Sequence, residues 1–265
     1  MIIDCHCHAG KGDGLTGPWD TSAPLQSYLH RAASAGIART VVFSAFHSNN
    51  RVANMQVAMI VSNIPDRLWG FVFVHPIRDA GRVYPMVRRF VDVYGFCGIK
   101  VHRHDGRITR EICDTAQLLK LPVLYDVVGE TAPLALIAAE YPTVSWIIPH
   151  LGSFADDWAA QSQLIDLLVR FDNLYADTAG VRRFDLLAEA IERAGPHKIL
   201  FGSDGPWLHP GLELAKIRAL RLAPQHEALV MGGNLLRLVQ PGLVRRQRHC
   251  LSTIRSFQST MPFNS

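Results

Sequence analysis

The sequence predicts a single-domain α/β protein whose strands close into a (β/α)8 TIM barrel. Short apolar runs alternate along the chain with stretches in which apolar residues recur every three to four positions. This alternation is typical of βα units. Strands rich in Val, Ile, Leu and Phe, without regular polar alternation, are typical of a parallel sheet covered by helices. The length of 265 residues fits one such barrel.

Eight strands and the helices between them can be placed along the chain. Helices are expected at residues 25–36, 83–95, 158–171 and 184–195, and a Gly at the end of such a stretch is typical of a helix C-terminus. A doubly wound open sheet is the alternative, but CHCHAGKGDG follows the first strand where a dinucleotide-binding fold has GxGxxG. The expected strands are residues 1–4, 40–46, 68–74, 96–101, 121–128, 144–150, 173–178 and 198–204.

Charge divides the chain into a barrel over residues 1–240 and a basic C-terminal tail over residues 241–265. The net charge is +4, and the tail holds four Arg and no acid, so residues 1–240 carry 23 basic and 23 acidic side chains. The tail is expected to be peripheral to the chemistry, and it could dock on the barrel or on a second copy in a homodimer. Neither nucleic acid nor a membrane is an expected partner.

The cysteines and the N-terminus indicate a cytoplasmic protein. No apolar run is long enough to span a bilayer, and MIIDCHCHAG is not a signal peptide. The five Cys form neither a disulfide framework nor a CxxC pattern, which favours a reducing compartment. Cys5 and Cys7 alternate with His6 and His8, so they are expected on the opposite face of the first strand.

Polar residues end several of the predicted strands. In a barrel the C-terminal ends of the strands meet at one rim, where catalytic groups lie. His6 and His8 are two residues apart, so on an extended backbone both rings point the same way and can bind one divalent ion. Across the chain the strand ends carry His6, His8, Lys100, His102, Asp126, His150 and Asp204.

Asp204 and His150 are the candidate catalytic groups. Asp204 follows an apolar strand, and its carboxylate can bind the ion directly or accept a proton from water that the ion activates. Capping of the next helix is the structural alternative for Asp204. His150 follows a buried run and suits an acid, a base or an electrostatic stabiliser, whereas a core histidine bonded to backbone is its structural alternative.

Together these motifs resemble the amidohydrolase superfamily. MIIDCHCHAG, GIKVH, PHLG, ILFGSDGPW and MGGNLLRL occur in the order found in its amidohydrolase-related branch, which is similar to aminocarboxymuconate-semialdehyde decarboxylase. The resemblance implies a TIM barrel from Met1 to about Val239 that hydrolyses C–N or C–O bonds or removes a carboxyl group. It also implies that His6 and His8 bind metal, that His150 is a second ligand or proton shuttle, that Asp204 is the final ligand or the base, and that Asn234 is structural.

One position departs from the family pattern. The family usually ends strand five with a histidine ligand, whereas LPVLYDVVG has Asp126 there. A carboxylate still binds Zn²⁺, the expected ion, and shifts the preference toward a harder ion such as Mn²⁺. Alternatively, His102 replaces the missing ligand, or the site holds no tight metal. If His102 is not a ligand, it is expected to contact substrate. Lys100 suits a substrate-carboxylate anchor, a modified bridging ligand or an inward ion-pair partner.

The leading hypothesis is a metal-dependent hydrolase that uses activated water on a small organic acid, lactone or amide. Nonoxidative decarboxylation of an unsaturated or aromatic acid at the same site is the alternative, and a non-catalytic metal- or ligand-binding barrel is the alternative from another class. Loop residues Trp19, Arg182 and Trp207 are expected to contact substrate, because aromatic walls and a guanidinium suit an unsaturated carboxylate.

Overall fold

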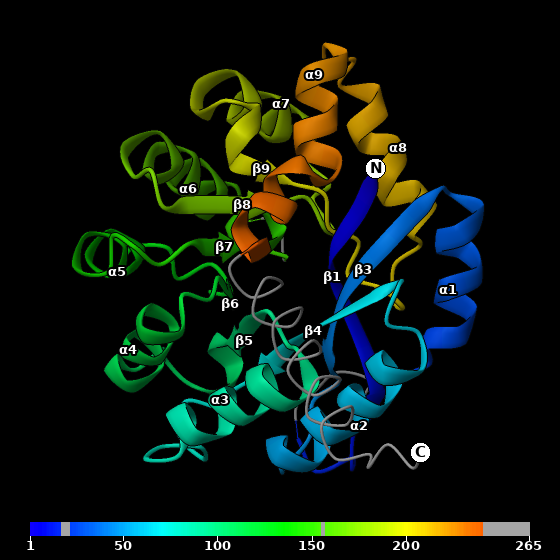
Figure 1. The fold of residues 1–265 in the computed structure, drawn as a ribbon. Helices are drawn as coiled ribbons and strands as arrows, with labels where there is room; N and C mark the ends of the chain where they lie inside the picture. Colours follow the sequence, from blue (N-terminus) through cyan, green and yellow to red (C-terminus); the bar gives the residue numbers. More distant parts are fainter. Residues whose placement is uncertain (17–21, 155–156, 241–265) are drawn as a thin grey trace, which may run out of the picture.

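The computed structural model describes residues 1–16, 22–154 and 157–240, and these form an α/β barrel (Figure 1). Neighbouring strands of the barrel pair in parallel and in chain order. This order confirms the predicted succession of βα units. The barrel strands are β1 (Ile2–Lys11), β3 (Ile37–Ser44), β4 (Leu68–Phe73), β5 (Gly98–His102), β6 (Val123–Asp126), β7 (Trp146–Ile148), β8 (Leu174–Asp177) and β9 (Ile199–Leu200).

The first strand closes the barrel against the chain that follows β9. The amide of Cys5 donates to the carbonyl of Phe201 at 3.0 Å, and the amide of His8 donates to the carbonyl of Gly205. Cys7 and Gly205 also form a parallel bridge. Because the first and last strands meet in this way, the sheet has no open edge there, and the doubly wound alternative is wrong.

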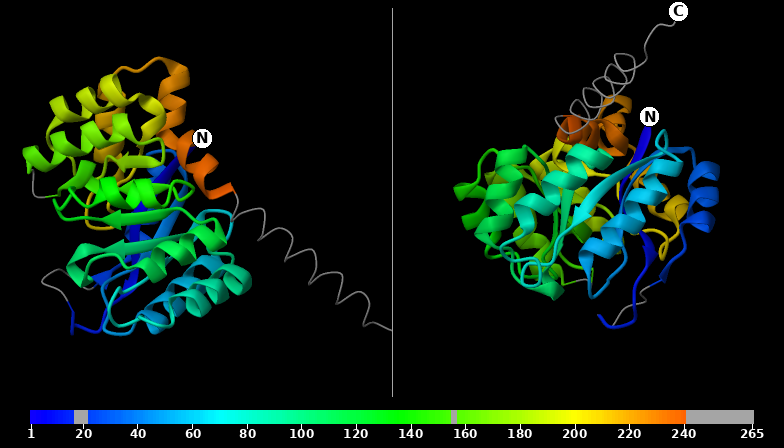
Figure 2. Two further views of the ribbon diagram at one scale, coloured as in Figure 1. Left: turned by 90° about the vertical axis from the view of Figure 1, so that its left-hand side faces the viewer. Right: turned by 60° about the horizontal axis from the view of Figure 1, so that its bottom comes forward.

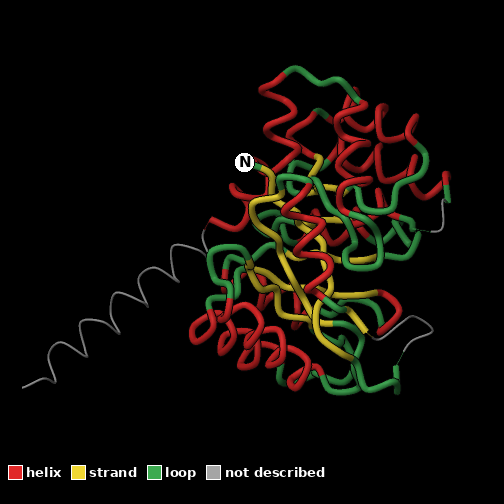
Figure 3. The backbone as a smooth tube through the Cα atoms, turned by 90° about the vertical axis from the view of Figure 1, so that its right-hand side faces the viewer, coloured by secondary structure: helices red, strands yellow, loops and turns green. Residues whose placement is uncertain are grey.

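Helices cover the outside of the barrel, as the red tube around the yellow strands in Figure 3 shows. The four helices placed from the sequence are confirmed, and Gly95 ends α3 in the left-handed conformation expected of a C-terminal glycine. The covering helices are α1 (Leu25–Ser34), α2 (Asn50–Asn63), α3 (Val83–Tyr94), α4 (Arg110–Leu119), α5 (Leu134–Glu140), α6 (Trp158–Arg170), α7 (Phe184–Ala194) and α8 (Pro210–Ala219).

The chain then crosses one end of the barrel (Figure 2). Helix α9 (Pro224–Ala228) leads into a π-helical turn (Leu229–Gly233), and residues 234–240 are helical. Leu235, Leu238 and Val239 of this last segment pack with the residues inside the barrel. The segment therefore covers the end of the barrel opposite the C-terminal ends of the strands, and leaves that second end open for a site.

Side chains inside the barrel form a core of their own. It includes Phe43, Phe71, Phe73 and Leu124, whereas alternate residues of the same strands pack outward against the helices. Gly98 makes room for the inner aromatics, because a Cβ at this position would lie 2.4 Å from the Phe71 ring. Barrels of this kind are filled by layers of inward side chains, so the lower lumen is solid core.

The structure departs from the sequence expectation in the first strand. The register of β1 against β3 shifts between Asp4 and Cys7, so Cys5 lies with the inner core and only Cys7 lies in the outer core. The expectation that both thiols face away from the histidines is therefore wrong for Cys5, because a bulge breaks the alternation of side chains. A short strand, β2 (Ser22–Ala23), also pairs antiparallel with the end of β1.

Two expectations fall on residues outside the described ranges. These are the contact of Trp19 with substrate and the peripheral position of the tail at residues 241–265. Within the described ranges, no helix has the length and apolar character needed to cross a membrane.

Asn234 joins the final helical segment to the barrel. Its buried side-chain amide donates to the carbonyls of Pro196 and Ile199, each at 2.8 Å. This geometry confirms the structural role expected for it. We predict that Asn234→Ala lowers the free energy of unfolding by about 2–4 kcal/mol, because one buried and one partly buried carbonyl lose their donor. Urea titration measures the change. Asn63→Ala, at the exposed end of α2, is the control, and an equal loss in both variants would contradict the prediction.

Candidate active site

The polar strand ends meet in a cavity of about 370 Å³ at the C-terminal end of the barrel. Strand β1 supplies two histidines, β5 and β6 supply one residue each, and the turns after β7 and β9 supply the rest. Apolar side chains form much of its wall, among them Phe46, Phe154, Trp207 and Leu208. The titratable residues that line it are His6, His8, His102, Asp126, His150 and Asp204.

His6, His8 and Asp204 form one group of potential metal ligands. Asp204 Oδ1 lies 3.3 Å from His6 Nε2 and 3.7 Å from His8 Nε2. One ligand atom from each residue lies within 4.8 Å of the others, a spacing that a single ion can bridge. The structure thus brings together three of the residues that the strand-end argument selected.

Hydrogen bonds at Nδ1 fix which ring nitrogen of these histidines faces the cavity. His6 Nδ1 donates to Asp177 Oδ2 at 2.8 Å, and His8 Nδ1 donates to the carbonyl of Ser44 at 3.0 Å. Burial keeps the pKa of His8 well below its ordinary value, so its Nε2 presents a lone pair to Asp204. Burial acts to lower the pKa of His6 as well, but the charge of Asp177 raises it overall, so without an ion His6 Nε2 donates to Asp204. A divalent ion would replace this proton between the two Nε2 atoms and the carboxylate, and the donor set fits such an ion.

Asp177 at the end of β8 supports this group. Its Oδ2 accepts from His6, and its Oδ1 accepts from the amides of His150 and Ala179, each at 3.0 Å. His6, His150 and Asp177 form a second group with metal-ligand spacing. Because both carboxylate oxygens of Asp177 already accept hydrogen bonds, it suits orientation of the histidines better than direct ligation. The run NLYADT carried the signal for Asp177, since it also ends a predicted strand.

On the other side of the cavity, Asp126 contacts His102 and His150. Its Oδ2 is 3.2 Å from His102 Nε2 and 3.4 Å from His150 Nε2, and its Oδ1 accepts from the amide of Val128 at 3.0 Å. His102 Nδ1 accepts from the amide of His104, so Nε2 of His102 carries the proton and donates to Asp126. Asp126 thus faces the cavity as expected, but its nearest charged partners are imidazoles.

His150 is held in its protonated form by these neighbours. Its Nδ1 donates to the carbonyl of Ala179 at 2.8 Å, so a second proton must lie on Nε2 for it to donate to Asp126. Burial alone would lower the pKa of His150, but the hydrogen bond and charge of Asp126 raise it to about 9. By contrast, burial holds the pKa of His8 well below its ordinary value. One site therefore contains a neutral and a cationic imidazole.

The carboxylates of the site stay ionised. Burial tends to raise the pKa of Asp204, but the hydrogen bond from His6 and the charges of His6 and His150 lower it to about 2. The pKa of Asp126 is likewise held well below its ordinary value, because the charge and hydrogen bond of His102 outweigh burial. Buried carboxylates with such partners are typical of functional sites.

Lys100 lies beneath the cavity rather than in its wall. It is fully buried, its Nζ has no hydrogen-bond partner among the described residues, and it stands 4.9 Å from the centre of the Phe43 ring. Burial lowers the pKa of Lys100, while the charges of Asp126, Asp204 and Asp177 act in the opposite direction. Lys100 does not line the cavity, and its place beside three carboxylates suits a residue that offsets their charge.

Backbone strain concentrates at the same rim. Val128, His150, Leu151 and Asp204 have φ between 49° and 60°, a left-handed conformation that non-glycine residues seldom adopt. Asp4 helps to hold this backbone: its carboxylate accepts from the amides of His6 and Ser203 at 3.0 and 2.9 Å. Strain maintained by surrounding bonds is typical of positions where a side chain must be aimed.

The substrate-contact candidates fall at different places. Trp207 lines the cavity, with its ring centre 4.5 Å from that of His8, and His102 lines it as well. Arg182 lines a neighbouring cavity of about 450 Å³ that shares Phe154 and Leu208 with the first. Phe46, Phe154 and Leu208 also line the cavity but could not be predicted from the sequence. Apolar residues in loops follow no sequence pattern that shows which of them face a cavity.

The model of the family described as Amidohydrolase matches residues 3–240. The chain belongs to the amidohydrolase family. A search among curated proteins finds no match to it.

Solved structures share the fold of this amidohydrolase. One is 2,6-dihydroxybenzoate decarboxylase from Rhizobium (TM-score 0.70, 17% identity, 91% of this chain and 99% of that one). Another is a dihydroxybenzoic acid decarboxylase from Polaromonas with bound manganese (TM-score 0.67, 17%, 90% and 96%). A third is a probable 2-pyrone-4,6-dicarboxylic acid hydrolase from Acinetobacter baumannii (TM-score 0.71, 15%, 90% and 99%). At sequence identities this low, these structures show that the chain shares their fold.

We predict that Asp126→Asn lowers the pKa of His150 in the metal-free protein. In the parent protein the imidazole should lose its proton as the pH rises through about 9. Without the carboxylate, burial dominates and the titration moves toward acid pH. The stability that His150 contributes is present below its unfolded pKa of about 6.5 and is lost as the pH rises through the folded value.

NMR titration of the histidine ring signals measures this shift. Glu130→Gln is the matched control, because Glu130 lies on the loop after β6 but pairs with Arg103 at 2.7 Å. An unchanged His150 titration in Asp126→Asn would contradict the assignment of Asp126 as its counter-ion.

Proposed function

We propose that this amidohydrolase is a metal-dependent hydrolase of a small organic acid, lactone or amide. The observation that carries the proposal is the division of the site into two groups. The Nε2 atoms of His6 and His8 face the Asp204 carboxylate on one side, and the His150 imidazolium is paired with Asp126 on the other. Hydrolysis needs a nucleophile generated at neutral pH and a nearby proton donor, and the two groups suit those tasks.

His6, His8 and Asp204 are the residues that would hold the ion. A divalent ion bound there would supply water with a pKa near neutrality. Two imidazoles and one carboxylate suit Zn²⁺, and Mn²⁺ is the alternative, supported by the bound manganese in the similar Polaromonas structure. Asp126 is the further ligand we proposed from the sequence, but its contacts with His102 and His150 favour a role as their counter-ion.

Two residues of the chain would transfer protons in this reaction, Asp204 as the base and His150 as the acid. The free carboxylate oxygen of Asp204 accepts the proton of the attacking water, since it is ionised at neutral pH. The C–N or C–O bond breaks, and His150 Nε2 donates its proton to the leaving nitrogen or oxygen. Asp126 stabilises His150 as a cation before transfer, and Lys100 lies below the carboxylates, whose charges favour its protonated form against burial.

The cavity limits the substrate to a small molecule with an apolar part. Its volume of about 370 Å³ suits a single ring or a short chain, and Phe46, Phe154 and Trp207 provide aromatic walls. The similar probable 2-pyrone-4,6-dicarboxylic acid hydrolase is consistent with a lactone substrate. Arg182, in the adjoining cavity, is placed to bind an anionic group at the far end of such a molecule.

Decarboxylation is a second candidate, favoured by the same aromatic walls. A flat unsaturated or aromatic acid would lie between Phe154 and Trp207, its C–C bond to the carboxyl group would break to release CO₂, and His150 would protonate the carbon that keeps the electron pair. The likeness to dihydroxybenzoate decarboxylases supports this candidate at the level of fold. Both candidates use His150 as an acid.

We predict that ligand and acid variants separate metal binding from turnover. His8→Gln and Asp204→Asn should lower metal content on elemental analysis, because each removes one of the three ligands. His150→Gln should keep the ion and reduce kcat by about 10²–10⁴-fold, the usual contribution of a positioned acid. Loss of the ion from His150→Gln to the same extent would overturn the division into two groups.

Turnover in H₂¹⁸O against lactones, amides and carboxylated aromatics distinguishes the two reactions. Hydrolysis places one ¹⁸O atom in the product for each turnover, whereas decarboxylation releases CO₂ and leaves none in the organic product. A metal-loaded protein that turns over neither class would contradict both candidates and favour a ligand-binding barrel.

A further inference from the structure

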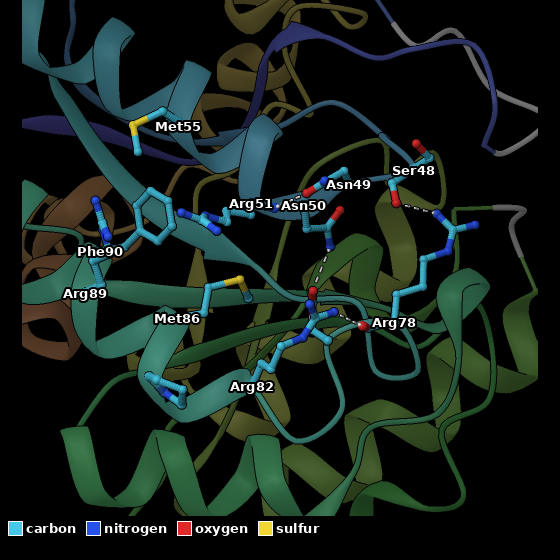
Figure 4. Close-up of a pocket in the computed structure, with 12 residues that line it drawn as sticks. Ser48, Asn49, Asn50, Arg51, Met55, Arg78, Arg82, Met86, Arg89 and Phe90 are labelled. Carbon is cyan, nitrogen blue, oxygen red and sulfur yellow. Dashed lines mark hydrogen bonds between the residues drawn. The ribbon is translucent and has the colours of Figure 1, made fainter.

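A second large cavity lies outside the active site, between α2 and α3 (Figure 4). Its volume is about 550 Å³, and the loops after β3 and β4 form one end of it. None of its lining residues also lines the active-site cavity. The size is that of a pocket for a small organic molecule.

Four arginines surround this cavity, which we call the arginine pocket. Arg51 comes from α2, Arg78 and Arg82 from the loop before α3, and Arg89 from α3. Arg78 donates to the carbonyl of Ser48 at 3.1 Å, and Arg82 donates to the carbonyl of Arg78 at 2.7 Å. Within the described part of the chain, none of the four forms an ion pair with a carboxylate, so most of their charge is not neutralised locally.

The single acid in the lining, Asp79, offsets only part of this charge, because its charge acts on Arg82. Asp79 is buried, and its Oδ2 accepts from the amide of His75 at 2.9 Å, so it caps the loop after β4. Other arginines of the molecule do form ion pairs. Arg88 pairs with Asp92 at 3.3 Å, and Arg193 pairs with Glu189 at 2.8 Å. The arginine pocket is therefore a local concentration of positive charge on a chain whose described part is close to neutral.

The floor of the pocket is apolar. Met55 from α2 and Met86 and Phe90 from α3 line it, and Phe90 belongs to the core between the strands and the helices. Figure 4 shows Arg51 extending toward Phe90, with Arg78 and Arg82 near the opposite end. Methionine side chains adapt to the shape of an apolar ligand. The lining thus matches a molecule with an apolar body and separated negative groups.

We propose that the arginine pocket binds a small organic anion with at least two negative charges and an apolar body. Guanidinium groups recognise carboxylate and phosphate oxygens through paired hydrogen bonds. Arginines from two helices and the intervening loop would converge on the anionic groups, while Met55, Met86 and Phe90 contact the body. The ligand reduces the mutual repulsion of the arginines, so its binding also stabilises the fold.

Calorimetric titration of the full metal-loaded protein tests the proposal. Naphthyl phosphate and naphthalene dicarboxylate are the dianionic probes, and neutral naphthol is the control for apolar contact alone. We expect saturable binding of at least one dianion with a Kd below about 1 mM at about 0.15 M ionic strength. Binding of the phosphate alone identifies a phosphorylated ligand, and binding of the dicarboxylate identifies a carboxylic acid.

Matched variants locate the binding. Arg89→Gln should weaken it by at least about 10-fold, because one charged hydrogen-bonding partner is lost. Arg88→Gln is the control, since Arg88 is adjacent on α3 and exposed but does not line the pocket. His8→Gln should leave binding unchanged, which separates this site from the active site. Absence of saturable binding, equal weakening by Arg88→Gln, or loss of binding in His8→Gln would overturn the proposal.

Discussion

The buried carboxylate of Asp177 is the constraint on which the candidate active site depends. It accepts hydrogen bonds from the His6 ring and from the amides of His150 and Ala179, so it joins the ends of β1, β7 and β8. A buried charge is costly without such partners. Because its partners include the ring of His6 and the backbone of His150, the same bonds that neutralise Asp177 also aim the two imidazoles.

Two proton states of histidine follow from this framework. Backbone or carboxylate acceptors hold the Nδ1 protons of His6, His8 and His150, and what differs is the group that faces each Nε2. Asp204 faces the first two, and Asp126, itself held by His102, faces the third. In the proposed mechanism, a metal-binding position and a proton-donating position lie on opposite sides of one small cavity. Lys100 is buried below both, and its Nζ has no hydrogen-bond partner among the described residues.

Much of the fold could be predicted from the sequence because its signals are local. The apolar runs and the amphipathic stretches located the barrel strands and the main helices, and the strand-end rule selected His6, His8, His150 and Asp204. The bulge in β1 that turns Cys5 inward could not be predicted, since it depends on pairing with β3. The sequence also could not show that Asp126 contacts His102 and His150. These residues come from β5 and from the turn after β7, so the contacts depend on how the strand ends are arranged in space.

The arginine pocket also could not be predicted from the sequence. Arg51 and Arg89 are 38 positions apart and carry no motif, and only the packing of α2 beside α3 places them on one cavity. The apolar walls of the active-site cavity were unpredictable for the same reason. Phe46 and Phe154 lie beside the histidines only because of the conformation of their loops. Single residues at strand ends are readable from a sequence, whereas sites formed by side chains on separate helices or loops require the structure.

In the proposed function, one ion binds between His6, His8 and Asp204 while Asp126 stays with the imidazoles. Anomalous diffraction from crystals grown with Mn²⁺ locates the ion. We expect a single peak within about 2.0–2.2 Å of His6 Nε2, His8 Nε2 and an Asp204 oxygen, with Asp126 outside that distance. A peak coordinated by Asp126 and His102, without His6 and His8, would contradict it.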